Sequence, residues 1–491
     1  MRKIFILSLS LFIAIAAEAK NLNKKVDVLV VCGGAGGTAA GIQSARSGAK
    51  TLIVEPSSWL GGMLTAAGVS CTDGNHDLPS GIWAEFRQKL YDRYGGPQAV
   101  ATGWVSYTQF EPHVGDSIFK AMTATEKNLQ VLYGYHFKKC ILSGHLVQGA
   151  IFENGKNTLT IHAKIVIDGT ELGDVMKASG TAYSLGMDSR KETGESMAPE
   201  QRSPIIQDIT YAAILKDYGP HADMTIKKPD SYNPKLFKGC CSLSTVKDSI
   251  DRIKMLNYGR LPHGKYMINW PEYGNDIYLN VVEKSEAERT KELKKAKEHT
   301  LSFIYYIQHE LGLKNLGLAD DEFPTADKLP FIPYHREGRR LQGVVLLTIN
   351  HILKPYDMPE KLYRTGISVG DYPIDHHHGQ NPHAPHIDFP PVPSFCVPMG
   401  AIVPKVTNGL LVTEKGISST NIVNGATRLQ PCVLLTGQAA GALAALSVKS
   451  NTQPRNISVR KLQNELLNQN AYLLPLFDIK PANPYFKAAQ K

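Results

Sequence analysis

The hydrophobic pattern near the start of the chain predicts a strand, a helix and a second strand in close succession. Residues 26–31 read Val-Asp-Val-Leu-Val-Val, a nearly unbroken β-branched run of the kind that forms a parallel strand buried on both faces. Residues 38–47 follow with many small side chains, which would let a helix lie close to a sheet. The next apolar run, 51–54, ends at Glu55. This order predicts a βαβ unit and an α/β fold.

A glycine-rich turn joins the first expected strand to the expected helix. A dinucleotide loop needs glycine where the chain turns, where its backbone approaches a pyrophosphate, and where the helix meets the strand. Cys32 takes the first glycine position of the GxGxxG pattern, and the glycines present are Gly33, Gly34, Gly36 and Gly37. Glu55 stands where an acidic side chain accepts hydrogen bonds from a ribose, which argues against NADP. These features predict a dinucleotide site, with a flexible glycine loop of another α/β fold as the alternative.

Further segments favour FAD over NAD as the dinucleotide. They are Gly61, Gly62 and Met63 after the second strand, Asp168 and Gly169 after the apolar run 164–167, and Gly437, Gln438, Ala439 and Gly441 in a small-residue helix. The amide groups at the start of that last helix could face the edge of a flavin ring. Arg428, just before it, could oppose the flavin or its phosphates. Each segment alone also fits a surface turn or close helix packing, but their order along the chain favours FAD.

The middle third of the chain has a different character. It contains polar loops at 220–234, a long helical pattern at 283–311, and a crowding of prolines and histidines at 355–404 that indicates irregular loops. A chain of 491 residues also exceeds what one hydrophobic core usually serves. We therefore expect a Rossmann-like FAD-binding domain over 25–200 and 395–491, interrupted by an inserted α+β substrate or cap domain over 201–394.

The first nineteen residues predict an export signal. Arg2 and Lys3 precede an apolar run over 4–17, and Ala17-Glu18-Ala19 has the small-x-small pattern of a cleavage site. A buried N-terminal helix is the alternative. We expect a periplasmic or extracellular protein whose mature chain has no apolar stretch of membrane-spanning length.

Charge and cysteine content exclude several classes of function. The formal net charge is +9, but the basic residues are scattered, and the basic run at 289–297 is interrupted by acids as on a solvated helix face. We therefore expect no nucleic-acid partner. The seven cysteines contain no CxxC pair, and the vicinal Cys240 and Cys241 cannot bridge without strain. Neither a disulfide framework nor a metal site is expected.

The densest titratable cluster is the run from Asp375 to His378. Flavin oxidation of a carbon needs a base for the departing proton, and histidine suits that role near neutral pH. His377 is the preferred base, with Asp375 as its partner. A metal site and solvated loop histidines are the alternatives, although adjacent histidines on an extended segment point to opposite faces.

A second polar cluster contains Arg336 and Arg339, which we take as candidates for substrate binding because guanidinium groups bind carboxylates and polarise oxygens. The alternative is an internal ion-pair network between domains. Trp270 and Tyr273 would stack on a sugar or pack the cap domain.

Taken together, these residues resemble the FAD-dependent oxidoreductase family of exported bacterial proteins, some of which carry a xanthan lyase label. The segments that resemble the family are 27–72, 167–174, 332–340, 371–377, 397–404 and 428–441. The resemblance implies FAD, a Rossmann-like domain completed by the C-terminal segment, and an inserted substrate domain. It implies no particular substrate. Cys32 is the main departure, and it leaves open how tightly the turn holds the pyrophosphate.

The expected activity is two-electron redox chemistry on a small polar substrate such as a sugar or an organic acid, with an unidentified electron acceptor. A polysaccharide lyase or hydrolase that uses the dinucleotide as a redox aid is one alternative. A non-catalytic flavin electron carrier is the other.

Overall fold

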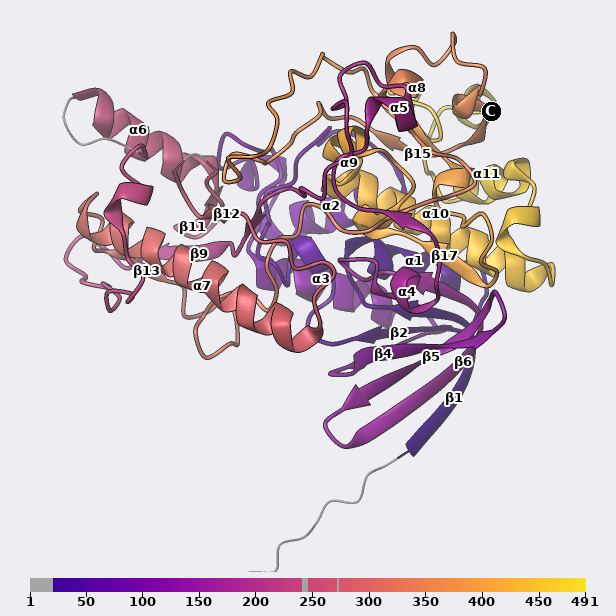
Figure 1. The fold of residues 1–491 in the computed structure, drawn as a ribbon, viewed down its shortest axis with the longest axis horizontal. Helices are drawn as coiled ribbons and strands as arrows, with labels where there is room; N and C mark the ends of the chain where they lie inside the picture. The colour runs from indigo at the N-terminus through magenta and orange to yellow at the C-terminus, as the bar shows by residue number, and fades with distance from the viewer. Residues whose placement is uncertain (1–20, 241–245, 272) are drawn as a thin grey trace, which may run out of the picture.

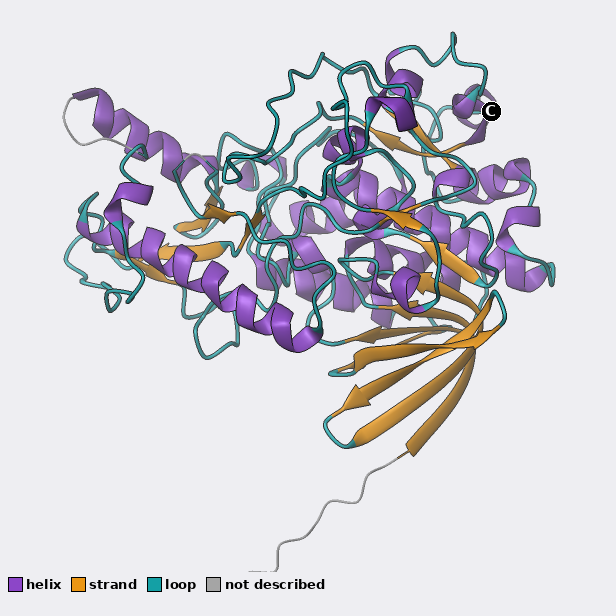
Figure 2. Ribbon diagram, in the orientation of Figure 1, coloured by secondary structure: helices purple, strands orange, loops and turns teal. Residues whose placement is uncertain are grey.

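The computed structural model describes residues 21–240, 246–271 and 273–491. The expected export signal, residues 1–19, lies outside the described residues, as does Cys241. Figures 1 and 2 show a strongly twisted sheet on one side of the molecule and a separate group of helices and strands, including α7, β9 and β11, on the other. Helices and long loops lie between them.

The main sheet contains the βαβ unit that the sequence predicts. Its strands are β1 (Asn21–Val31), β2 (Thr51–Glu55), β3 (Leu129–Tyr133), β4 (His136–Ser143), β5 (Leu146–Asn154), β6 (Asn157–Asp168) and β17 (Leu410–Val412). Their order is β3-β2-β1-β6-β5-β4, and β17 pairs in parallel with β6. Strands β3, β2, β1 and β6 run parallel, whereas β4, β5 and β6 pair antiparallel. The carboxyl ends of β1, β2, β6 and β17 therefore meet at one edge, although β17 comes from late in the chain.

Helices α1 (Ala35–Arg46) and α10 (Gln430–Lys449) pack closely against each other beside this sheet. A Cβ atom at Gly437 would lie 2.2 Å from the Gly36 carbonyl oxygen, and one at Gly441 would lie 2.1 Å from that of Ala40. Only glycine fits at such distances, so Gly437 and Gly441 allow the two helix backbones to touch. Helices α2 (Gly81–Tyr94) and α3 (Pro112–Ala124) complete this layer.

We expected no apolar stretch of membrane-spanning length after the first nineteen residues, and helix α10 corrects this expectation. Among the described residues it is the one helix long and apolar enough to cross a membrane. Of its apolar stretch, 94% is buried inside the protein. These side chains therefore form part of the core.

The long helical pattern at 283–311 is confirmed as α7 (Glu286–His309), which begins with a capping box between Ser285 and Glu288. It packs on a four-stranded antiparallel sheet in the order β10-β11-β9-β13. The strands and helix of this region are β8 (Ile209–Thr210), β9 (Ala213–Asp217), α6 (Val246–Tyr258), β10 (Arg260–Leu261), β11 (Lys265–Ile268), β12 (Asp276–Ile277) and β13 (Leu316–Leu318). Phe303 and Ile307 of α7 are fully buried in the core of this region.

Short elements fill the rest of the chain. They are α4 (Asp174–Ala178), β7 (Tyr183–Ser184), α5 (Arg190–Thr193), β14 (Arg340–Leu341), α8 (Ile349–Leu353), β15 (Gly366–Gly370), β16 (Phe395–Pro398), α9 (Asn421–Thr427), α11 (Val459–Asn468) and α12 (Phe486–Ala489). Strands β15 and β16 pair antiparallel across the loop 371–394, so the region expected to be loops contains a two-stranded ribbon. The division of the chain into domains at 200 and 394 stays a prediction.

Candidate cofactor and active site

The glycine turn between β1 and α1 is tight, and Cys32 takes part in it. Cys32 has a φ of +71°, the left-handed conformation that glycine would adopt without strain. A Cβ atom at Gly37 would lie 2.2 Å from the Cys32 carbonyl oxygen, and one at Gly169 would lie 2.6 Å from it. The turn therefore forms with cysteine in its first position, and the chain needs glycine where β6 and α1 approach that turn.

A cavity of about 730 Å³ opens at the carboxyl edge of the main sheet. Gly34, Gly62 and Gly169 contribute backbone to its wall, and Glu55 lies at one part of it. The Glu55 carboxylate accepts a hydrogen bond from the Gly33 N–H at 2.8 Å and two from Ser57, at 2.8 Å from the backbone N–H and 2.6 Å from the hydroxyl. These bonds fix the carboxylate beside the turn, where a ribose would meet it.

The segment Gly61–Met63 folds back against the same turn. Gly61 and Gly62 both have positive φ, and a Cβ atom at Gly62 would lie 2.7 Å from the Cα atom of Gly34. Gly62 lines the cavity, whereas the Met63 side chain is fully buried in the core. Glycine at these two positions thus lets the segment pack against Phe119 and the turn, and Met63 anchors the segment.

The Asp168 carboxylate forms hydrogen bonds within the loop that follows β6. It accepts hydrogen bonds from the Thr170 N–H at 3.0 Å, the Thr170 hydroxyl at 2.6 Å and the Met176 N–H at 2.9 Å. Burial raises the pKa of this carboxyl to about 6. Gly169 and Thr170 line the cavity. Asp168 therefore shapes the cavity wall by holding the loop after β6.

Sequence reasoning missed an acidic group at the start of α1. Glu414 lies shortly after β17, separated from it by Thr413, has a φ of +57°, and accepts a hydrogen bond from the Gly37 N–H at 2.9 Å. Its carboxylate lies against Gly34, where a Cβ atom would be 2.4 Å away. Burial and the nearby Glu171 raise its pKa to about 7, and Lys415 pairs with Glu171. An acid just after an apolar strand, as at Glu55, was the signal that could have found it.

The predicted cofactor residues of helix α10 have structural roles. Gln438 accepts a hydrogen bond from the Ile82 N–H at 3.0 Å and donates one to the Gln43 side chain at 2.9 Å. Gly437 and Gly441 contact α1, and Ala439 is fully buried. Within the described part of the chain, none of these four residues lines the cavity. These contacts fit the alternative interpretation of the segment, in which its small residues allow two helices to pack closely.

His377 lies between two carboxylates. Its Nδ1 atom is 2.8 Å from Asp276 Oδ2, and its Nε2 atom is 3.3 Å from Asp375 Oδ2. Asp276 comes from β12, about a hundred residues earlier in the chain. The predicted partnership with Asp375 is present as a contact, and Asp276 is a second, unexpected partner.

The charges around His377 set its protonation. Burial and Arg336 favour the neutral ring, but Asp276 and Asp375 outweigh them and raise the pKa of His377 above its ordinary value. Burial alone would raise the pKa of Asp375, yet Arg428 and His377 hold it well below its usual range. Asp276 is likewise held ionised by Arg336 and His377 against the effect of burial. The three groups therefore favour an imidazolium between two carboxylates.

Two buried arginines complete this cluster. Arg336 donates to Asp276 at 3.1 Å, and Arg428 donates to Asp375 at 2.8 Å and to the Tyr334 hydroxyl at 2.6 Å. Both guanidinium groups lie over the Tyr334 ring, at 4.9 and 5.8 Å from its centroid. The Nε atoms of both arginines have no hydrogen-bond acceptor among the described residues. The cluster thus retains N–H donors for an oxygen-bearing ligand.

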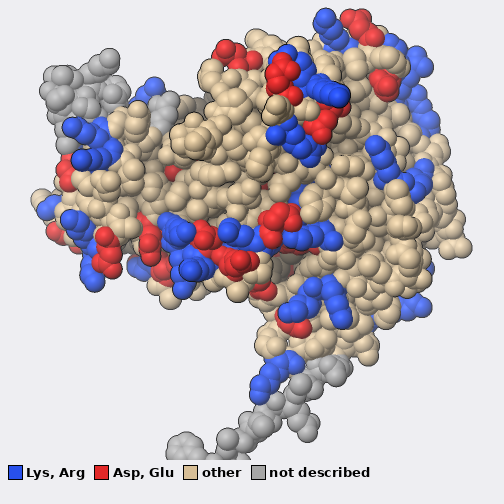
Figure 3. Space-filling model, in the orientation of Figure 1, with Lys and Arg blue, Asp and Glu red and all other residues tan. Residues whose placement is uncertain are grey.

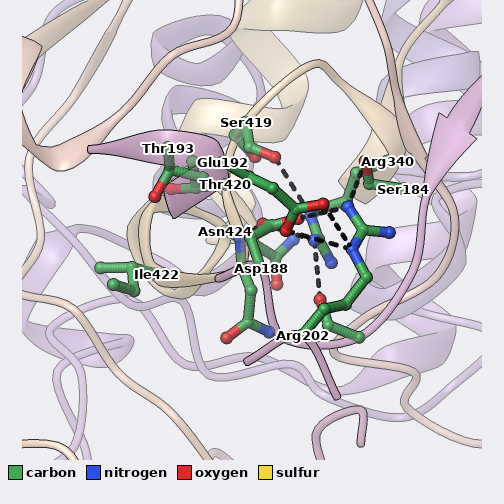
Figure 4. Close-up of polar contacts among 12 residues, drawn as sticks. Ser184, Asp188, Glu192, Thr193, Arg202, Arg340, Ser419, Thr420, Ile422 and Asn424 are labelled. Atoms are coloured by element: carbon green, nitrogen blue, oxygen red, sulfur yellow. Dashed lines mark hydrogen bonds and ion pairs between the residues drawn. The ribbon is translucent and has the colours of Figure 1, made fainter. Parts of the chain in front are cut away.

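Arg339 and Arg340 point away from this cluster. Arg339 pairs with Asp174 at 2.9 Å and with Glu283 at 2.8 Å, so the ion-pair alternative describes its contacts. Arg340 pairs with Asp188 at 2.8 Å, and Figure 4 shows it among side chains gathered from several distant segments. Of the predicted arginines, Arg336 and Arg428 are those brought to His377.

Asp73 is a further group that sequence reasoning missed. It comes after Gly61 and Gly62 in the sequence. Its backbone N–H donates a hydrogen bond to the side-chain oxygen of Gln430 at 3.0 Å. Burial and the negative charge of Asp375 raise its pKa to about 7, against the opposing effects of Arg428 and His377. Asp73 is therefore a carboxyl group that changes charge near neutral pH.

Two other candidate groups have structural explanations. Trp270 packs edge-on against Trp104 and Tyr258, with ring centroids 6.4 and 5.4 Å apart, which fits the packing alternative. Glu111, His113 and Glu322 place ligand atoms close enough for a metal ion. The Lys265 ammonium, however, lies 2.7 Å from both glutamate carboxylates. That ammonium already lies between the two carboxylates and balances one of their two charges.

Comparison with known families decides the assignment. The model of the FAD-dependent oxidoreductase family matches residues 27–466. The chain belongs to this family. FAD is therefore its cofactor, and the predicted α/β fold with a Rossmann-like FAD-binding domain is confirmed. The glycine-walled cavity beside Glu55 fits that cofactor, and the protein is a redox enzyme.

Solved structures that match the chain at low sequence identity include a reductase-like protein, a monooxygenase and a brominase. A geranylgeranyl bacteriochlorophyll reductase-like protein from Thermoplasma acidophilum is 13% identical with a TM-score of 0.38, over 90% of this chain and 82% of that one. The p-nitrophenol 4-monooxygenase of Pseudomonas putida is 11% identical with a TM-score of 0.37, over 95% and 92%. A flavin-dependent brominase is 11% identical with a TM-score of 0.40, over 88% and 81%. No curated protein matches significantly.

Proposed function

We propose that this FAD-dependent enzyme oxidises or reduces a small polar substrate, a sugar or an organic acid, beside the cluster around His377. The observation that carries the proposal is the imidazole of His377 between the carboxylates of Asp276 and Asp375, next to Arg336 and Arg428. Bound FAD supplies the two-electron chemistry. The residues of the cluster supply proton transfer and hydrogen bonds.

The protonation state of His377 determines whether the side chain can donate or accept a proton. Reduction of a carbonyl requires a proton donor, and the raised pKa of His377 favours the protonated ring. Oxidation of a hydroxyl group requires an acceptor, so His377 must first lose its proton. His377 is therefore an acid in one direction, and a base in the other only above its raised pKa. Asp73, with a pKa of about 7, is a second candidate acceptor.

The free donors of the cluster favour a substrate that carries oxygen. The Nε–H groups of Arg336 and Arg428 are buried and lack acceptors among the described residues. A buried donor without a partner costs about 1 to 3 kcal/mol, so a bound hydroxyl, carbonyl or carboxylate oxygen would relieve that cost. Sugars and organic acids offer such oxygens, whereas hydrocarbon substrates do not.

Anaerobic mixing of the FAD-loaded enzyme with a panel of sugars and organic acids tests this proposal. We expect at least one compound to bleach the flavin absorbance within seconds to minutes. Release of cleaved or unsaturated sugar without bleaching would support a lyase or hydrolase instead. Reduction by a protein donor and by no small molecule in the panel would support an electron carrier.

We also propose that the enzyme acts outside the cytoplasm. The basic start, the apolar run and the Ala17-Glu18-Ala19 pattern of the first residues support this location. N-terminal sequencing of the protein from its native cells tests it: a mature chain that begins at Lys20 is expected, and a chain that begins at Met1 would contradict the proposal.

A further inference from the structure

The FAD cavity has a wall from the inserted region as well as walls from the sheet. Residues Lys284, Glu286, Arg289 and Leu293, at the start of helix α7, line one side of it. His136, Phe137 and Lys138 of β4 and the segment Gly169–Asp174 line the other parts. The start of α7 therefore covers a cavity whose base belongs to the nucleotide-binding sheet.

Ion pairs fasten the start of α7 to the sheet side of the cavity. The Arg289 guanidinium forms two hydrogen bonds with the Asp174 carboxylate, both at 2.8 Å. Just before the helix, Glu283 pairs with Lys177 at 2.7 Å and with Arg339 at 2.8 Å, and Arg339 also pairs with Asp174. Figure 3 shows a row of alternating acidic and basic side chains along the course of α7. Pairs of opposite charge therefore hold the start of α7 against the sheet side of the cavity.

Both ends of α7 have apolar anchors, and its start also carries ion pairs to the sheet side of the cavity. Val281 and Val282, just before the helix, are fully buried, and Leu293 packs against their cluster. The later turns of the helix contribute Phe303, Ile304 and Ile307 to the core of the inserted region, where they are fully buried. At its start, the side chains of Arg289 and Asp174 remain 20% and 31% exposed. Ion pairs with access to water are weakened by salt and open more readily than buried apolar contacts. The Arg289–Asp174 pair is therefore the salt-sensitive part of the contact between the start of α7 and the sheet side of the cavity.

We propose that the first turns of α7 are a latch over bound FAD, closed by the Arg289–Asp174 pair, whose opening sets the rate of FAD release. Arg339 and Glu283 are positioning residues of this latch, and Lys284 and Leu293 contribute to the wall that the cofactor meets. The inference rests on FAD as the cofactor of the proposed function, but it concerns retention of the cofactor and holds whatever the substrate is.

The test measures the rate of FAD release from the full-length holoenzyme without substrate. The holoenzyme is diluted, and the fluorescence of the released flavin is monitored over time. Between about 0.01 and 1 M salt the screening length falls from about 30 to 3 Å, so release from the wild type should accelerate. Arg289→Ala should release FAD about tenfold faster at low salt, the change that ~1.4 kcal/mol produces, and respond less to added salt. Arg289→Lys should fall between the two.

Lys295→Ala is the matched control. Lys295 lies on the same helix and pairs only locally with Glu292 at 2.6 Å, so its loss should leave FAD release unchanged. Wild-type release that does not respond to salt would overturn the proposal without any variant. Equal release rates in Arg289→Ala and Lys295→Ala would also overturn it. Neither result depends on turnover, so neither bears on the redox activity.

Discussion

His377 carries most of the proposed proton chemistry at the scale of single residues. Replacing it with alanine should leave FAD bound, because His377 does not line the glycine-walled cavity described above. Substrate-driven flavin reduction should slow by roughly 10²- to 10⁴-fold, the usual loss when general acid or base assistance is removed. Stopped-flow reduction at matched flavin content measures this. A rate within about threefold of the wild type would reject His377 as the proton-transfer group, given that expected loss.

Glu55 is the residue on which cofactor affinity should depend most directly. In Glu55→Gln the amide is neutral, and a hydrogen bond to a charged group is worth about 1.5 to 3 kcal/mol. We expect FAD affinity to fall by roughly 10- to 100-fold. Titration of the apoprotein with FAD measures it, and Glu200→Gln, at an exposed ion pair, is the control. Unchanged affinity would remove Glu55 from the ribose site.

Sequence reasoning at this scale could predict the position of a residue that follows a local pattern. Glu55 ends a buried strand and was expected beside the glycine turn, where its carboxylate accepts a hydrogen bond from Gly33. Asp276 was missed because it meets His377 from a position 101 residues away, and no local pattern links the two. Glu414 has a local signal, its place shortly after an apolar strand, but its contact with Gly37 spans 377 residues and could not be predicted. Contacts of this kind depend on the topology and not on neighbouring residues.

At the scale of elements, the contact between α1 and α10 is the tightest constraint on the nucleotide turn. In Gly437→Ala the new methyl group would lie 2.2 Å from the Gly36 carbonyl oxygen, so the helices must separate. Overpacking of this kind costs about 1 to 3 kcal/mol of unfolding free energy. FAD affinity should fall as well, because Gly36 belongs to the turn that receives the cofactor.

Denaturant unfolding and FAD titration of the same Gly437→Ala variant check this prediction. Gly379→Ala is the control, because no atom lies within 4 Å of a Cβ atom built there. A Gly437→Ala protein with wild-type stability and FAD affinity would show that the helix contact is looser than the structure has it.

The glycines of α10 also show how far an element can be predicted. The order of strand, turn, helix and strand was recovered because burial and periodicity are local properties. Gly437 and Gly441 were predicted to lie in a helix whose amide groups face the flavin ring, with close helix packing as the alternative. A glycine needed for helix contact and one needed for a ligand look the same in sequence. The partner helix α1, which distinguishes the two meanings, lies almost four hundred residues earlier.

Within the whole molecule, three buried acids should contribute less to the stability of the apoprotein as the pH rises. Burial raises the pKa of Asp73 and Glu414 to about 7 and that of Asp168 to about 6, above their values in an unfolded chain. Each acid then binds more protons in the folded state than in the unfolded state from about pH 4 upward, so its contribution to the unfolding free energy falls up to its raised pKa. His377, whose pKa is also raised, contributes in the same direction as its proton is lost. Buried histidines with a lowered pKa, such as His335 and His376, act in the opposite direction.

Urea unfolding of the apoprotein at pH 5 and pH 8 measures this slope. Glu414→Gln removes one titrating acid and should be less sensitive to pH by up to about 3 kcal/mol across the window, because each pKa unit corresponds to about 1.4 kcal/mol. A Glu414→Gln protein whose unfolding free energy changes with pH as much as that of the wild type would contradict the raised pKa of Glu414.

We propose above that this enzyme transfers two electrons between a small polar substrate and FAD. An anaerobic titration of the FAD-loaded protein with the compound that bleaches it, with flavin absorbance and product followed together, tests this transfer. We expect one molecule of oxidised product for each FAD reduced, and restoration of both flavin colour and activity when an electron acceptor is added. Consumption of the compound while the flavin stays oxidised would rule out electron transfer to FAD.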